Sequence, residues 1–160
     1  MSMAGRSIAS LVTFDVGENT SYGIFRIVVR SVLIALLLFI GYTGYEGWHN
    51  EYIPGFLEVG AVISFLMWGS ERIWKITVMP MIAQFPWWGG LASKLPFWFL
   101  GGGIGYTAGM LTAKKLGLLI VYDRPVEMLF LFGGKFGMTI QLVASVIAYR
   151  MAKQEKEQAR

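Results

Sequence analysis

The chain has 160 residues, of which 55% are hydrophobic and 15% charged, and its mean hydropathy is +0.54. Soluble domains carry about 25% charged residues, so this composition argues against an ordinary soluble domain and indicates an integral membrane protein. The formal net charge of +4 comes from Lys and Arg residues scattered at the ends of apolar runs, which argues against a nucleic-acid partner. Because the chain has no cysteine, it can form no disulfide and hold no iron–sulfur cluster.

Length and apolar content predict a single all-α membrane domain with about four spans, because each span needs about 20 apolar residues to cross the hydrocarbon. Residues 1–23 are predicted to form an N-terminal cytoplasmic or interfacial segment. Residues 24–149 form the transmembrane helices, and residues 150–160 form a charged cytoplasmic tail that is expected to extend the last helix.

The first two spans are predicted at about residues 24–45 and 56–74. Arg26 and Arg30 lie one turn apart at the start of the first span, and their long side chains are expected to reach the lipid headgroups. Glu71 lies at the inner end of the second span. We interpret it as an anchor at the membrane interface.

Between the second and third spans, residues 76–95 stay apolar although prolines and paired glycines interrupt the helical pattern. This combination favours an interfacial or re-entrant segment. Tryptophan is enriched where membrane meets water. We therefore predict lipid contact at headgroup depth for Trp87 and Trp88 and for Trp98 nearby.

The third span, residues 96–113, carries Gly101, Gly105 and Gly109 at intervals of four, so the three fall on one helix face. Interior glycines weaken a soluble helix by about 0.5 to 1 kcal/mol each relative to alanine. In a membrane they let two helix backbones approach closely, which drives association by van der Waals contact. The glycines therefore predict a helix-packing face.

A similar stripe lies on the fourth span, residues 126–149, where Gly133, Gly137 and Ala144 fall near one face together with Gln141. We predict that this stripe meets the glycine face of the third span and that the Gln141 amide forms a hydrogen bond across the contact.

Basic residues next to the predicted spans indicate the orientation. With an even number of crossings and both termini in the cytoplasm, most flanking Lys and Arg residues fall on the cytoplasmic side, as the positive-inside rule requires. The exceptions are Lys114, Lys115 and Arg124, all in the third connection. We expect a multi-pass protein of a bacterial cytoplasmic (inner) membrane.

Two charges are predicted at membrane depth, Lys135 inside the fourth span and Glu58 near the outer end of the second. A charge at the bilayer centre costs about 2.5 to 3.5 kcal/mol even on the lenient insertion scale. Lys135 can pair with Glu58, with Glu127 or with a carboxylate of a neighbouring subunit. Alternatively, its amine reaches outward to the headgroups, or it lines an ion path.

Residues for catalysis are scarce, since His49 is the only histidine and lies in a hydrophilic connection. Neither a histidine-rich metal centre nor a serine hydrolase triad is therefore expected. We predict no enzymatic activity, no metal and no cofactor apart from structural lipids.

The favoured function is that of a non-catalytic structural or assembly subunit of a larger membrane complex, for example a secretion, conjugation or energy-transducing machine. Its partners would be other membrane subunits, copies of itself and lipids, held through small-residue helix faces. One alternative is a small oligomeric channel or transporter with Lys135 and Glu58 facing the pore. A second is a lipid-handling protein that uses the aromatic residues 85–98.

Overall fold

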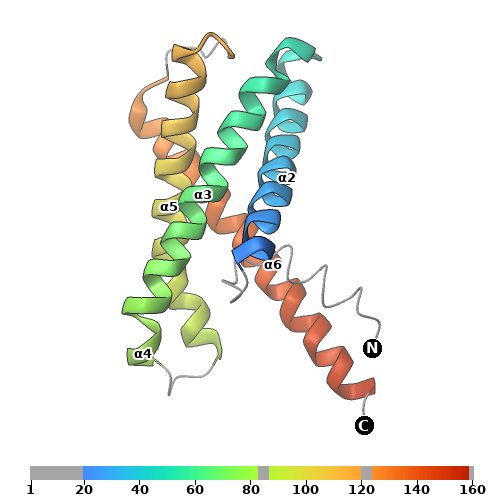
Figure 1. Ribbon diagram of the computed structural model, residues 1–160, viewed down its shortest axis with the longest axis vertical. Coiled ribbons are helices and arrows are strands. Elements are labelled where there is room, and N and C mark those ends of the chain that lie inside the picture. The colour runs from blue at the N-terminus through green and yellow to red at the C-terminus, as the bar shows by residue number, and fades with distance from the viewer. Residues whose placement is uncertain (1–19, 83–86, 120–123, 159–160) are drawn as a thin grey trace.

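A computed structural model describes residues 20–82, 87–119 and 124–158, and within them all regular secondary structure is helical (Figure 1). The long helices are α2 (Thr20–Glu46), α3 (Ile53–Thr77), α5 (Trp87–Lys115) and α6 (Val126–Gln158). Two short elements flank α3: the 3-10 helix η1 (Asn50–Tyr52) precedes it and α4 (Met79–Ile82) follows it. Most of the predicted N-terminal segment lies outside the described residues.

The long helices form an antiparallel row rather than a closed bundle. Helix α2 packs on α3, α3 on α5, and α5 on α6, whereas α2 and α6, at the two edges of the row, make almost no direct contact. Figure 1 shows α6 crossing the row at an angle, so that the start of α2 and the end of α6 lie toward the same end of the molecule. The row is therefore open between its two edge helices.

Among the described residues, three helical stretches are long and apolar enough to cross a membrane, namely Ile27–Glu46, Asn50–Thr77 and Val126–Ile147. This confirms the predicted all-helical fold with membrane-spanning helices and indicates a multi-pass membrane protein. Helix α5 is not among them although it has 29 residues. Its many glycines, together with tryptophan and threonine, are only weakly apolar and lower its hydropathy.

Helix α5 begins earlier than the sequence predicted. It runs through Pro96 without interruption, so the predicted interfacial or re-entrant segment is helical from residue 87 onward. A proline inside a helix costs about 3 kcal/mol because it removes a backbone hydrogen bond and clashes with the preceding turn. Ser93 and Trp98, on either side of the proline, are both hydrogen-bonded to side chains of α3. These contacts hold the early turns of α5 in place.

The face of α5 that carries Gly101, Gly105 and Gly109 packs against α3. A Cβ atom at Gly105 would lie 2.8 Å from the Cα of Ile63, and one at Gly109 would lie 3.0 Å from the Cα of Val59. Such distances leave no room for a side chain. The sequence paired this face with α6, and its actual partner in the structure is α3.

The contact between α5 and α6 uses a different glycine. A Cβ atom at Gly102 would lie 2.6 Å from the carbonyl oxygen of Gly133 and 3.0 Å from the Cα of Gly137. Because three consecutive glycines cover two neighbouring faces of one helix, α5 offers a smooth surface to α3 and another to α6. Gln141 and Ala144 are buried on α6, but the predicted hydrogen bond is not formed: the Gln141 Nε2 has no partner among the described residues.

Small residues also join α2 to α3. A Cβ atom at Gly60 of α3 would lie 3.0 Å from both the backbone nitrogen and the Cβ of Ala35 on α2. After α2 the chain turns at Gly47, whose φ of +92° is a conformation that favours glycine. These two features place the N-terminal half of α3 directly against α2.

Candidate functional site

A polar cluster joins α3 to α5 near the end at which the two helices are connected. We call it the Glu71 cluster, and it consists of Glu71, Trp74, Ser93, Lys94 and Trp98. Glu71 accepts hydrogen bonds from Lys94 Nζ at 2.5 Å and from Trp98 Nε1 at 2.7 Å, one on each carboxylate oxygen. Trp74 Nε1 donates to Ser93 Oγ at 2.9 Å. Five side chains thus form three hydrogen bonds between α3 and α5, two of them to Glu71.

Burial makes this cluster energetically important. The Glu71 side chain is 7% exposed and that of Lys94 is 26% exposed. The Lys94 ammonium also lies 4.4 Å from the centre of the Trp74 ring, which adds a cation–π attraction. A buried ion pair is tolerated only when its remaining hydrogen-bonding capacity is satisfied. Because both Glu71 carboxylate oxygens already have donors, we interpret the cluster as a structural clamp.

The structure corrects two predictions made for individual residues, Trp98 and Arg30. Trp98 is 2% exposed rather than in contact with lipid, and Glu71, predicted as an anchor at the membrane interface, is buried against α5. Arg30 is 3% exposed, because it lies on the same face of α2 as the buried Ile34 and Leu38 rather than on the outer face. In each case the side chain faces a neighbouring helix that the sequence could not position.

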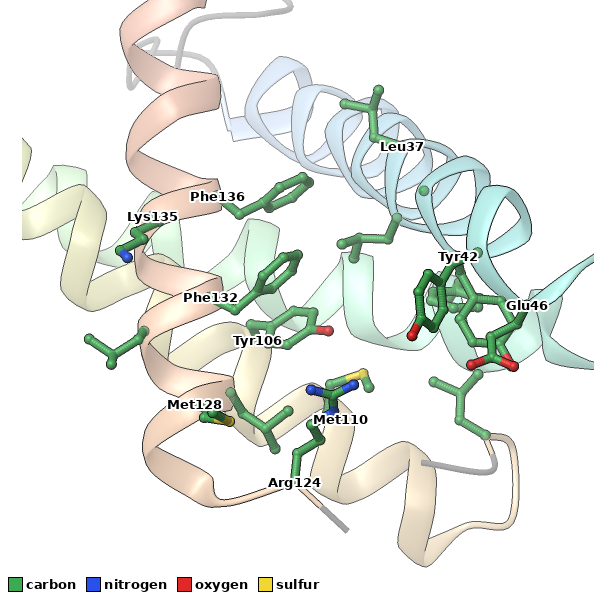
Figure 2. A pocket seen from close by; sticks show the side chains of 17 residues that line it. Leu37, Tyr42, Glu46, Tyr106, Met110, Arg124, Met128, Phe132, Lys135 and Phe136 are labelled. Atoms are coloured by element: carbon green, nitrogen blue, oxygen red, sulfur yellow. The ribbon is translucent and has the colours of Figure 1, made fainter. Parts of the chain in front are cut away.

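An open groove of about 740 Å³ lies between α2 and α6 (Figure 2). Residues 37–46 of α2 line one wall and residues 128–136 of α6 line the other. Tyr106 and Met110 of α5 line the space between them, together with Phe56 of α3. The groove exists because the two edge helices of the row do not meet. Its volume falls within the range typical of small-molecule sites, about 300 to 1,000 Å³.

One end of this groove is polar. Glu46, the last residue of α2, and Arg124, just before α6, both line it, as do Tyr42 and Tyr106. Figure 2 shows the Arg124 guanidinium and the hydroxyls of the two tyrosines directed into the same space. Neither Glu46 nor Arg124 forms an ion pair with the other or with any other described residue. The charges are therefore available to a ligand.

Lys135 lies on α6 at the rim of the groove and is exposed. Figure 2 shows its amine directed away from the phenyl rings of Phe132 and Phe136. Lys135 makes no hydrogen bond or ion pair within the described residues. The structure therefore does not pair Lys135 with Glu58. The Glu58 Oε2 atom is buried and has no hydrogen-bond partner among the described residues.

Some predicted site residues lie outside what the structure describes. This applies to the side chains of Arg26, Trp87 and Trp88. Within the described residues, no three His, Asp or Glu side chains lie close enough together to hold a metal ion. Comparisons with protein families, with curated proteins and with solved structures gave no match for this chain.

Proposed function

We propose that this protein is a non-catalytic structural subunit of a larger integral membrane complex and that Lys135 is the point at which it pairs with another subunit. The single observation behind the proposal is an exposed lysine, without an ionic partner in the described chain, on the outer face of a membrane-spanning helix. An unpaired charge in lipid is expensive. A neighbouring subunit with a carboxylate at the same depth would remove that cost.

The depth of Lys135 follows from helix geometry. Val126 begins α6, and at 1.5 Å per residue Lys135 lies about 14 Å further along the helix axis. The hydrocarbon layer is about 30 Å thick, so this position is near its middle. Its exposed neighbours on α6 carry no charge, and Leu131, Phe132 and Leu142 among them are apolar. Lys135 is thus an isolated charge in a surface otherwise suited to lipid or to another helix.

The arrangement of the helices supports four crossings as part of this proposal. Helix α5 lies between α3 and α6 and is antiparallel to both, so it would traverse the same layer of the membrane as its neighbours. Its glycines, which lower its hydropathy, are covered by those neighbours. An even number of crossings places both termini on one side, and the basic residues favour the cytoplasmic side of a bacterial inner membrane.

Affinity purification in mild detergent followed by mass spectrometry tests the proposal. We expect the native protein to retain one or more membrane partners. Lys135→Met should lose them, because the change leaves the partner carboxylate unpaired at a cost of about 3 to 5 kcal/mol. Thr139→Met, one turn further along the exposed face, is the matched control and should retain them. A native protein that purifies alone would contradict the proposal.

The alternative of a small channel makes a different prediction at the same residue. In a ring of identical copies, Lys135 would face pore water and its charge would oppose the passage of cations. Lys135→Met would then change ion selectivity in planar bilayers while leaving assembly intact. Conductance by the purified native protein, together with that change, would favour the channel over the structural subunit.

A further inference from the structure

The α2–α6 groove carries two opposite charges that do not neutralise each other. Glu46 and Arg124 both line its polar end, and neither has an ionic partner in the described chain. Since unpaired charges at a partly enclosed surface favour a ligand with complementary charges, the groove calls for a molecule that carries both signs.

The remainder of the groove is apolar. Leu38 and Phe56 on one side and Leu129 on the other are each less than a tenth exposed, and Phe132 and Phe136 continue the surface along α6. A ligand for this groove must therefore have a charged end and an apolar body. That description fits an amphiphile better than a peptide helix, whose charges would be distributed along its length.

The position of the polar end agrees with a membrane lipid. It lies where α2 ends and α6 begins, beside the exposed Tyr45 and Trp48. Exposed tyrosine and tryptophan are typical of the headgroup layer. A lipid in the groove would thus have its headgroup at the correct depth and its acyl chain along the apolar walls.

We propose that the α2–α6 groove binds a zwitterionic phospholipid with a primary ammonium group, of the phosphatidylethanolamine type. Arg124 binds the phosphate, for which a guanidinium provides two parallel N–H donors, and Glu46 binds the ammonium. A choline headgroup has no N–H donor for Glu46. A glycerol headgroup leaves the Glu46 carboxylate without a counter-charge. Neither headgroup contact involves Lys135, so the lipid site can be tested independently of the proposed contact between Lys135 and a partner subunit.

The apolar part of the site is tested by filling it. Gly41 lines the groove, and a Cβ atom there would meet nothing within 4 Å, so Gly41→Leu places a side chain in the groove without disturbing helix packing. Gly44, on the same helix, also has open space around its Cβ position but does not line the groove, which makes Gly44→Leu the matched control. Native mass spectrometry should find phospholipid retained by the native protein and by Gly44→Leu and lost from Gly41→Leu.

Headgroup recognition is tested by titration of the delipidated protein in detergent with phosphatidylethanolamine, phosphatidylcholine and phosphatidylglycerol of identical acyl chains. We expect tightest binding of phosphatidylethanolamine. Glu46→Gln should weaken that binding about tenfold, the scale of a hydrogen bond between charged groups, and should abolish the preference over phosphatidylcholine. Glu51→Gln, an exposed carboxylate near the same membrane face but outside the groove, should change neither.

Three results would overturn the proposal. The first is equal lipid retention by Gly41→Leu and Gly44→Leu. The second is equal affinity for the three headgroups. The third is a native protein that holds no lipid but self-associates, with self-association abolished by Gly41→Leu, because the occupant would then be a helix of a second copy. The Lys135→Met experiment is unaffected by any of these results.

Discussion

At the scale of single residues, the Glu71 cluster shows how much depends on contacts between distant parts of the sequence. Glu71 and Lys94 are 23 residues apart, and Glu71 and Trp98 are 27 apart. The only signal in the sequence was an acidic residue near the end of one apolar helix and a basic residue near the start of the next. Antiparallel neighbours bring such positions together, but the rotation of each helix about its axis, which decides whether the two side chains face each other, cannot be read from the sequence.

Removal of one partner from this ion pair should be more damaging than removal of both. Lys94→Met leaves Glu71 buried without its counter-charge and should lower the free energy of unfolding by about 3 kcal/mol, toward the lower end of the range for broken buried pairs because Lys94 is partly exposed. The double variant Glu71→Gln with Lys94→Met should recover most of that loss. Thermal unfolding in detergent measures both, with the exposed Lys115→Met as a control. A double variant no more stable than Lys94→Met alone would show that the charges do not act as a pair.

At the scale of helices, periodicity and apolar length were good guides. The predicted spans at residues 24–45 and 56–74 lie inside α2 and α3, and the span predicted from residue 126 begins where α6 begins. The start of α5 was missed because local helix breakers were overruled by hydrogen bonds to α3. Which helix each glycine face contacts was equally beyond the sequence, since consecutive glycines give one helix two smooth faces.

The α3–α5 contact gives a direct test of glycine packing. Gly105→Leu should destabilise the protein by more than about 3 kcal/mol, above the usual cost of overpacking, because its Cβ would meet the backbone of Ile63 at 2.8 Å. Leu100→Ala on the same helix should have little effect, since Leu100 is 49% exposed. The melting temperatures of the two variants in detergent provide the comparison. Equal losses would mean that the glycine face is not a close contact.

At the scale of the whole molecule, the decisive property is the number of crossings. Among the described residues, hydropathy identifies three candidate spans, and α5, which packs between α3 and α6, is the proposed fourth. Because the chain has no cysteine, single-cysteine variants can be labelled without background. The exposed positions Asn50, Met81, Lys115 and Gln154 sample successive connections and the final helical extension.

Labelling with a membrane-impermeant maleimide should divide these positions into two pairs. If α5 crosses the membrane, cysteines at Met81 and Gln154 react from the cytoplasmic side, and cysteines at Asn50 and Lys115 react from the opposite side. If α5 does not cross, Met81 and Lys115 react from the same side. Intact and inverted vesicles distinguish the two arrangements, and the second result would remove the model of four crossings.

The two smooth faces of α5 have a mechanical consequence. Side chains that interlock fix how far one helix can slide along another, whereas a glycine face presents little relief along the axis to resist sliding. Longitudinal register between α3 and α5 must then be fixed elsewhere, and the Glu71 cluster is placed to do so, since each of its hydrogen bonds tolerates only a small displacement. The Glu71–Lys94 ion pair thus fixes the register of α5 along α3, while the close backbone contact at the glycines stabilises the packing of the two helices.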